Sequence, residues 1–243
     1  MRFHALVLAT VLVVCGGAKA DPPVKVGVHE GVPFAFAQAS GEWSGLYVEL
    51  TQAIARQADT SLQIEVLPFP RLRQYLKDGS IGAVLAVPNS DMLADSVAVG
   101  DVMEFDVIAL GRAGTQVHSL DELRGTTICL TRRSSLVPEL YADTRFLLRE
   151  VSHHDSCPKM LDAGRVDFII TLPIGLTYLL AKMDRTMADY GEPFVIKHVP
   201  VQLLVARAHA TAALMQSLRL ALDKAKADGS IDAIRTRYEK YRR

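Results

Sequence analysis

The sequence predicts an α/β protein built from two units, each with its own parallel sheet. The first observation is that short runs with β-strand character alternate with amphipathic, helix-like segments along the 243 residues. Strands separated by helices usually pair in parallel. The second observation is that the alternation starts again near residue 113, and a chain of this length can hold one or two domains. We therefore expect one unit at about 24–110 and a second at about 113–198.

The first unit is expected to contain four strands. Residues 24–28 and 62–66 alternate apolar and polar side chains, as a strand with one buried face does. Residues 82–87 form an unbroken apolar run, which is typical of a strand buried on both faces. A short apolar run at 107–110 completes the set. Helical periodicity between these strands predicts helices at 47–57 and 72–77.

The second unit and the C-terminal segment continue the pattern. The expected strands are 126–131, 147–151, 166–171 and 199–207. The expected helices are 134–141, 153–163, 172–183, 211–227 and 231–241. The last strand and the last two helices need a sheet to pack on. If they return to the first unit, the chain crosses twice between the two units.

The first twenty residues have the features of a secretory signal. Arg2 gives a positive start, residues 5–14 are almost all apolar, and Ala18-Lys19-Ala20 forms a small-x-small cleavage pattern. The apolar run is shorter than the roughly 20 residues that a membrane span needs. We therefore expect residues 1–20 to be a signal peptide that is cleaved after Ala20, and the mature chain to be exported.

Two cysteines, Cys129 and Cys157, remain after that cleavage. In an oxidising compartment they can form a disulfide, and with only two thiols the pairing is determined if a bond exists. The alternative is two buried thiols that pack as small apolar side chains. The sequence leaves both alternatives open.

Composition and motifs exclude several classes of function. The 27 basic and 27 acidic residues balance, so no basic surface indicates a nucleic-acid partner. Neither a nucleophile-elbow, dinucleotide or P-loop motif nor metal-ligand spacing occurs, so we expect no cofactor and no metal. His153 and His154 are neighbours and would point apart on a helix. Acidic residues are plentiful, but no pair of them indicates acid–base catalysis.

Candidate ligand contacts lie where strands end, because open α/β sheets bind ligands at the carboxyl ends of their strands. Glu30 and Phe34 follow the first strand, and Phe69 and Arg71 follow the second. The segment 131–135 is predicted to open a helix, whose free N–H groups favour an anion. Core packing is the alternative for each aromatic side chain.

Charge gives conflicting indications of the ligand's polarity. From Asp78 to Gly111 the chain has six acidic residues and no Lys or Arg, which favours a cationic or neutral ligand. Arg132 and Arg133 favour an anionic one. Solvated surface charge explains either tract without any ligand.

Six segments in order resemble the family 3 extracellular solute-binding proteins, the receptors of polar amino-acid ABC transporters. The segments are VKVGVHEGVPFAF, GEWSGLYVELTQAIA, FPRLRQYLKDGSIGAVLA, SLDELRGTTICLTRRSS, MLDAGRVDFIITLP and LALDKAKADGSIDAIRTRYEKY. The resemblance implies a type II periplasmic-binding-protein fold, in which two lobes of mixed and parallel sheet are joined by two crossover strands. Lobe 1 would comprise 21–110 and 206–243, and lobe 2 would comprise 111–205, with hinges near 110–112 and 205–207.

The resemblance and the strand-end positions together predict a ligand site. The expected ligand-binding residues are Glu30, Phe34, Phe69, Arg71, Pro88, Asn89, Thr131, Arg132, Ser134, Ser135 and Thr171. Two departures from the family pattern stand out. The stretch 88–93 lacks the Arg that clamps an α-carboxylate, and 171–173 lacks the Asp that receives the α-amino group. Because an unpartnered buried carboxylate is costly, a standard α-amino-acid pose is not expected.

The resulting prediction is a periplasmic receptor that closes on a small polar ligand for ABC-type uptake. Its partners would be that ligand and a membrane permease complex, and we expect a monomer. One alternative is a ligand sensor that presents its closed form to a membrane signalling partner. Another is an enzyme resembling cyclohexadienyl dehydratase, for which Glu30 is the only acid that the sequence nominates.

Overall fold

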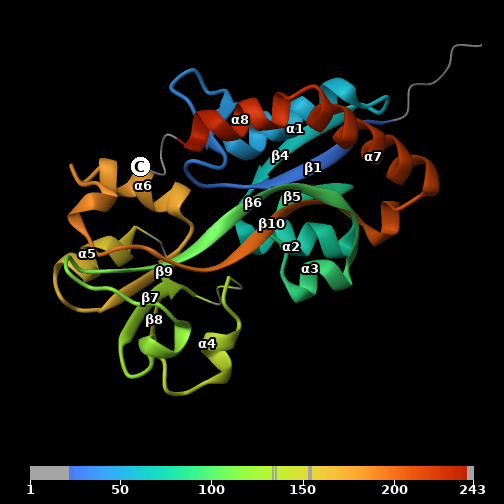
Figure 1. The fold of residues 1–243 in the computed structure, drawn as a ribbon. Coiled ribbons are helices and arrows are strands. Elements are labelled where there is room, and N and C mark those ends of the chain that lie inside the picture. The colour runs from blue at the N-terminus through green and yellow to red at the C-terminus, as the bar shows by residue number, and fades with distance from the viewer. Residues whose placement is uncertain (1–21, 133, 135, 153–154, 240–243) are drawn as a thin grey trace, which may run out of the picture.

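The computed structural model describes residues 22–239 apart from 133, 135, 153 and 154 (Figure 1). The predicted signal peptide with its cleavage site at Ala20, the predicted ligand contact Ser135, and the pair His153 and His154 lie outside the described residues.

One sheet of eight strands runs through the described part of the chain, in the order β4-β1-β5-β10-β6-β9-β7-β8. The strands are β1 (Val24–His29), β4 (Leu62–Leu67), β5 (Ala83–Ala86), β6 (Ser96–Gly111), β7 (Thr127–Thr131), β8 (Leu147–Val151), β9 (Phe168–Thr171) and β10 (Phe194–Ala206). A separate small hairpin pairs β2 (Phe36–Ala37) with β3 (Trp43–Ser44). Strand β1 is parallel to β4 and β5, and β7 is parallel to β8 and β9. These two parallel groups belong to the two lobes. The antiparallel strands β6 and β10 lie between them and join them into one sheet, where the sequence predicted a separate sheet for each unit.

The helices cover both faces of this sheet (Figure 1). They are α1 (Leu46–Gln57), α2 (Phe69–Asp78), α3 (Ser90–Ala94), α4 (Glu139–Ala142), α5 (Ser156–Asp162), α6 (Pro173–Ala181), α7 (Ala212–Ala227) and α8 (Ser230–Glu239). Short 3-10 turns lie at Leu120–Leu123, Met187–Asp189 and Arg207–His209. In the first lobe, α1, α7 and α8 cover one face, and α2 and α3 the other. None of the described helices has the length and apolar character that a membrane crossing requires.

Strand β5 explains how the first lobe is packed. Leu85 joins the core beneath α1, together with Leu50 of that helix. Its neighbour Val84 joins the core on the opposite face, with Leu72 of α2. Because successive residues of a strand point to opposite faces, a strand covered on both sides must be apolar throughout. The continuous apolar run in the sequence therefore indicated this position correctly.

Strands β6 and β10 connect the lobes and are longer than predicted. One end of β10 pairs with β5, where Val205 lies opposite Ala83. The far end of β6 pairs with β9, where Leu110 lies opposite Ile169. The sequence predicted only 107–110 and 199–207, because polar residues such as Asp101 and Glu104 recur along β6 and interrupt its apolar pattern. The two crossover strands implied by the family resemblance are present. Strand β6 leads into the second lobe, and β10 returns the chain to the first lobe, where α7 and α8 pack.

Two predicted helices in the second lobe begin later than expected. Among the described residues of 134–141, helical structure starts only at Glu139, just after Pro138. Proline has no N–H to donate and disfavours helical geometry in the residue before it, so the helix cannot extend back through Val137. The predicted helix opening at 131–135 is therefore wrong for its described residues. The helix predicted at 153–163 begins at Ser156, which places Pro158 in its first turn, where proline is tolerated.

Cys129 and Cys157 form a disulfide, with their Cα atoms 5.6 Å apart. Both cysteines are fully buried in the core that packs α5 and α6 against the second sheet. Of the two alternatives that the sequence left open, the bonded one is therefore present. The bond ties α5 to the middle of β7.

Candidate functional site

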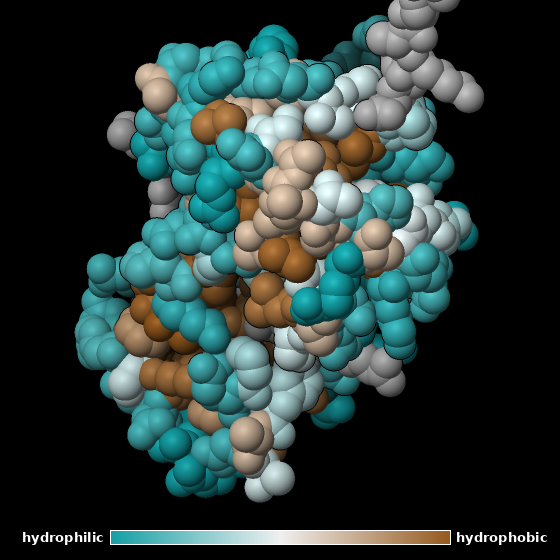
Figure 2. Space-filling model, turned by 90° about the vertical axis from the view of Figure 1, so that its right-hand side faces the viewer, coloured by the Kyte–Doolittle hydropathy of each residue, from teal (hydrophilic) through white to brown (hydrophobic). Residues whose placement is uncertain are grey.

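A cavity of about 510 Å³ lies between the two lobes. The first lobe contributes the end of β1 and the loop that follows it, from His29 to Phe34. The second lobe contributes the segments that follow β7 and β8, the end of β9, and α6. Each of these strands thus reaches the cavity near its carboxyl end, which is where open α/β sheets bind ligands. The space-filling view shows one side of the molecule, with apolar residues at the surface where its upper and lower parts meet (Figure 2).

The predicted site residues divide into those that line the cavity and those that do not. Its lining includes Glu30, Phe34, Thr131, Ser134 and Thr171. The other described candidates are absent from the lining, namely Phe69, Arg71, Pro88, Asn89 and Arg132. The first group comes from both lobes, so the structure brings these sequence-distant positions together around one space.

Asn89 is used by the first lobe itself. Its side-chain oxygen accepts a hydrogen bond from the Met92 backbone N–H at 2.9 Å and so caps α3. Asp91 in that helix forms an ion pair with Arg73 of α2. The polar stretch after β5 is therefore a short helix bound to its own lobe. Arg71 is exposed in the first turn of α2, outside the cavity.

Aromatic rings support the first-lobe side of the cavity. The ring of Phe34 lies 5.0 Å from that of Tyr47 and 5.9 Å from that of Phe105, measured between centroids. Phe69 packs edge-on against His29 at 5.6 Å, so it holds the lining in place without joining it. Burial lowers the pKa of His29, which favours the neutral imidazole at pH 7. Burial also raises the pKa of Tyr47, which stays a neutral phenol.

The sequence did not identify most of the second-lobe lining. Apolar contacts there come from Leu136, Ile170, Leu172 and Leu179, and polar ones from Ser152, Asp155, Tyr178 and Lys182. Helix α6 is apolar on all sides, and such a pattern ordinarily indicates a helix buried in a core. Tyr178 and Lys182 are four residues apart and so share a helix face. This pair of polar side chains on an otherwise apolar helix was the one feature of the sequence that could have indicated the second-lobe lining.

A tyrosine outside the cavity holds part of this lining. The Tyr141 hydroxyl accepts a hydrogen bond from the Ser134 backbone N–H at 3.1 Å and donates one to the Glu150 carboxylate at 3.0 Å. Burial and the neighbouring Glu150 raise the pKa of Tyr141 to about 12. The hydroxyl therefore keeps its proton and ties the Ser134 segment to β8.

Comparison with known protein families shows to which family the chain belongs. The sequence pattern of the bacterial extracellular solute-binding proteins, family 3, matches residues 24–241. The chain belongs to this family. A probable amino-acid-binding protein of Bacillus subtilis (strain 168), YxeM, is 24% identical over 264 aligned residues, which cover 98% of this chain and 94% of that protein.

Solved structures of similar proteins show the same fold. A histidine kinase sensor domain with similarity to periplasmic binding proteins matches with a TM-score of 0.74 and 18% identity, covering 89% of this chain and 95% of the other. The substrate-binding protein of an amino acid ABC transporter matches with a TM-score of 0.70 and 16% identity, covering 90% and 100%. This solute-binding protein therefore has the type II periplasmic-binding-protein fold that the sequence predicted.

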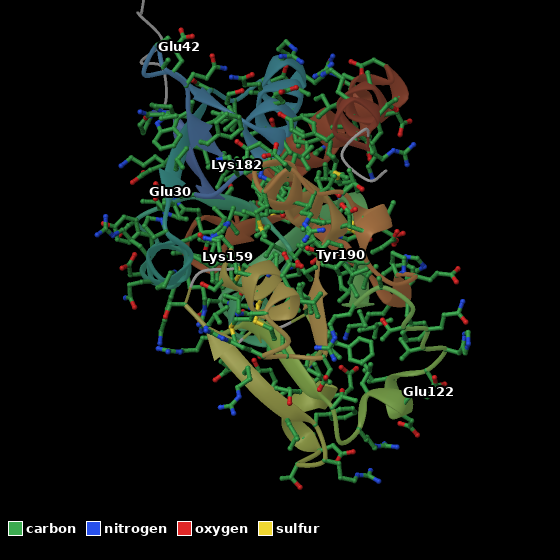
Figure 3. The ribbon with its side chains drawn as sticks, turned by 90° about the vertical axis from the view of Figure 1, so that its left-hand side faces the viewer. Glu30, Glu42, Glu122, Lys159, Lys182 and Tyr190 are labelled. Carbon is green, nitrogen blue, oxygen red and sulfur yellow. A yellow bond between two sulfur atoms is a disulfide. The ribbon has the colours of Figure 1, made fainter. Side chains whose placement is uncertain are left out.

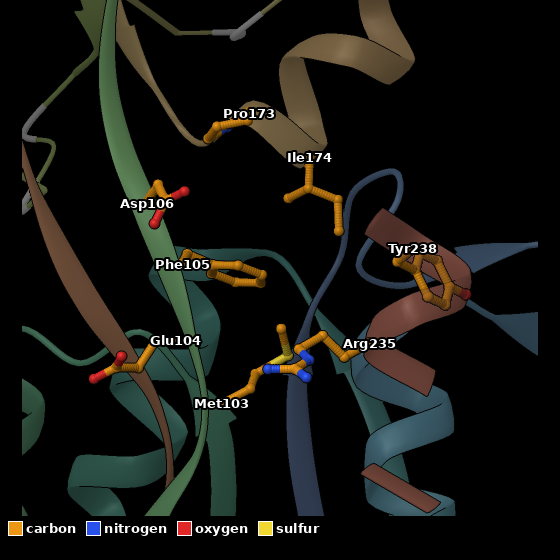
Figure 4. Close-up of a pocket in the computed structure, with 8 residues that line it drawn as sticks. All are labelled: Met103, Glu104, Phe105, Asp106, Pro173, Ile174, Arg235 and Tyr238. Carbon is orange, nitrogen blue, oxygen red and sulfur yellow. The ribbon is translucent and has the colours of Figure 1, made fainter. Parts of the chain in front are cut away.

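A second, small cavity of about 30 Å³ lies where α6, β6 and α8 meet (Figure 4). Its volume suits only one or two water molecules. Ile174 from α6 and Phe105 from β6 lie on its two sides, with Tyr238 of α8 beside them. Ile174 is only 5% exposed and belongs to the core of the first lobe, although α6 itself belongs to the second. The first turn of α6 therefore joins the two lobes of this solute-binding protein.

Gly45 is expected to be essential for the shape of the cavity's first-lobe loop. It has a φ of 124°, and a Cβ added there would lie 2.5 Å from the Phe34 carbonyl oxygen. The next two N–H groups donate hydrogen bonds to Pro33 and Phe34 carbonyls. We expect Gly45→Ala to cost about 1–3 kcal/mol in the free energy of unfolding, measured by urea denaturation.

Gly41 provides the matched control for this prediction. Its φ is 84°, but no atom lies within 4 Å of the position of an added Cβ. Gly41→Ala therefore introduces backbone strain without the collision with the loop. Equal losses in the two variants would show that the contact with Phe34 has no role of its own.

No cluster of three or more His, Cys, Asp or Glu side chains among the described residues is placed to hold a metal ion. The described lining of the cavity combines apolar side chains, hydroxyl groups and the charged side chains of Glu30, Asp155 and Lys182.

Proposed function

We propose that this solute-binding protein is a periplasmic receptor that closes on a small polar ligand and delivers it to a membrane permease for ABC-type uptake. The observation that carries the proposal is the cavity of about 510 Å³, whose lining comes from both lobes. A ligand there contacts both walls at once, so its binding favours the closed arrangement over an open one. The volume lies within the range of small-molecule sites.

We infer that the hinge lies in the middle of β6 and β10. The ends of these strands are held by β5 and β9, whereas Glu104 and Pro200 lie opposite each other between those regions. Pro200 cannot donate a backbone hydrogen bond, which makes this the weaker part of the ladder. Lobe boundaries would then fall near 105 and 200, closer to the strand centres than the predicted 110 and 206.

We also infer that the ligand does not take the standard α-amino-acid pose. The described first-lobe lining comprises His29 to Phe34 and holds no Lys or Arg. Thr171, Leu172 and Pro173, which end β9 and begin α6, hold no acid. The two groups that would clamp an α-carboxylate and an α-amino group are therefore missing at their usual places.

The disulfide supports export, because such bonds persist in oxidising compartments. The signal peptide over 1–20 and the monomeric state stay predictions. N-terminal sequencing of the protein secreted by its host tests the first, with Asp21 as the expected new N-terminus. Size-exclusion chromatography with light scattering tests the second.

Ligand saturation is expected to stabilise the protein. A ligand at 100 times its dissociation constant adds about 2.7 kcal/mol. For a chain of this size, that corresponds to a rise in melting temperature of roughly 5–10 °C. The measurement is differential scanning fluorimetry against fractions of a metabolite extract from the host, followed by mass spectrometry of the bound compound. If no fraction raises the melting temperature, the proposed receptor function is wrong.

Experiments with the identified ligand separate receptor, enzyme and sensor. Recovery of the ligand unchanged after long incubation supports binding, whereas turnover of prephenate or arogenate that is lost in Glu30→Gln would support a dehydratase-like enzyme. A deletion strain that no longer takes up the labelled ligand supports transport. Normal uptake with a lost transcriptional response would instead support a membrane sensor as the partner.

A further inference from the structure

Three charged side chains line the interlobe cavity among the described residues. Glu30 comes from the first lobe, and Asp155 and Lys182 come from the second. All three are exposed, and none of them takes part in the ion pairs formed within the described part of the chain. Opposite charges therefore face one cavity from the two lobes without meeting each other.

Lys182 is held in position but not neutralised. Its ammonium nitrogen lies 4.8 Å from the centroid of the Tyr178 ring, one helical turn earlier on α6. Such a contact attracts the cation to the ring face and leaves its charge available for an anion. Figure 3 shows Lys182 above the second-lobe helices and Glu30 near the end of the first-lobe strands.

Closure of the lobes removes water from these groups. A buried charge without a partner costs several kcal/mol, so the ligand must compensate for both signs. A simple anion would satisfy Lys182 but would face two carboxylates. A simple cation would satisfy a carboxylate but would leave Lys182 without a partner. A ligand that carries both an anionic and a cationic group pairs with Lys182 and with Glu30. Of the three charged side chains described in the lining, only Asp155 is then left without a partner, and its side chain is exposed just before α5.

We propose, on the basis of the proposed receptor function, that the cleft takes a zwitterion in the orientation opposite to the family's usual one. Its carboxylate lies on Lys182 of the second lobe, and its ammonium group lies on Glu30 of the first. The usual arrangement places the cation on the first lobe and the acid on the second. The apolar lining between these charges, which includes Phe34, Ile170 and Leu179, accommodates an apolar chain or ring. The ligand class is therefore an amino acid whose charged groups are separated by an apolar body.

The test uses probes that differ only in their charged groups. The probes are ω-amino acids of three to eight carbons, each compared with the matching carboxylate, the matching amine and the isomeric α-amino acid. For six carbons these are 6-aminohexanoate, hexanoate, hexylamine and norleucine. We expect at least one ω-amino acid to bind about tenfold or more tightly than its three counterparts, measured by isothermal titration calorimetry.

Charge variants then assign the two contacts. Lys182→Gln is expected to weaken binding of the best ω-amino acid by roughly tenfold to a hundredfold. It should not weaken binding of the matching amine, because it removes the cation that the amine leaves without a partner. Glu30→Gln is expected to weaken binding of the same ω-amino acid by a similar factor. It should not weaken binding of the matching carboxylate. Lys159→Gln on α5 and Glu42→Gln in the β2–β3 turn are the controls, because both side chains are exposed and absent from the cavity lining (Figure 3).

The double exchange Glu30→Lys with Lys182→Glu provides a final check, because it restores one charge of each sign. It should bind the zwitterion more tightly than Lys182→Glu alone. The proposal is overturned if Lys182→Gln binds as tightly as Lys159→Gln, or if no ω-amino acid binds the wild-type protein. A compound from the host extract that raises the melting temperature despite this result would leave the receptor function intact and refute only the ligand class.

Discussion

Removal of the Cys129–Cys157 disulfide in the double variant Cys129→Ala, Cys157→Ala is expected to lower the free energy of unfolding by about 3–4 kcal/mol. The bond joins residues 28 positions apart, and opening this loop increases the conformational freedom of the unfolded chain. Both sulfur atoms are in a buried core, so the small cavity left by alanine adds to the loss. Urea denaturation followed by circular dichroism measures the difference.

Reduction of the wild-type protein is the control for this prediction. Wild type in dithiothreitol should lose a similar amount of stability, whereas the double variant should not respond to the reductant. The bond connects β7 and α5, whose ends carry Thr131 and Asp155 at the cavity. A loss below about 1 kcal/mol in both experiments would show that the second lobe is held by its apolar core alone.

Ile174→Ala is expected to cost about 2–4 kcal/mol in the free energy of unfolding. Ile174 is 5% exposed and carries a second-lobe helix into the first-lobe core, beside Phe105 and Tyr238. Loss of its side chain leaves a void at the place where the lobes are joined. We therefore also expect the lobes to separate more readily, which small-angle X-ray scattering detects as a larger radius of gyration without ligand.

Leu220→Ala is the matched control, because Leu220 lies on α7 with half of its side chain exposed. A surface truncation of this kind usually changes stability by no more than about 0.5 kcal/mol. If Ile174→Ala costs no more than Leu220→Ala and leaves the scattering unchanged, the contact does not hold the lobes together. The comparison therefore distinguishes a joining contact from ordinary surface packing.

The elements that the sequence predicted well are those whose own residues carry a strong pattern. Helix α1 has its apolar stripe at Leu46, Leu50 and Ile54, and it begins within one residue of the predicted position. Helix α7 begins after Thr211, whose side chain caps it through the Leu214 N–H. In these segments local propensity and burial favour the same structure, so the periodicity of the chain is sufficient.

The prediction failed where contacts distant in sequence outweigh the local pattern. Strand β6 is held along its length by β10, so its polar residues remain in a strand despite breaking the apolar alternation. Asn89 illustrates the same limitation for the site. It was among the predicted ligand contacts, but its side chain caps α3 within the first lobe and does not line the cavity.

The amino-acid sequence alone was sufficient to predict the alternation of strands and helices, the family and the two-lobe architecture. It also showed that the usual Arg at 88–93 is missing, because that absence can be seen in the residues themselves. Only the tertiary structure decided that the two cysteines are bonded and that Glu30 and Lys182 face one cavity. Such relations depend on how distant segments are brought together in space, and the periodicity of a single segment contains no information about its distant neighbours.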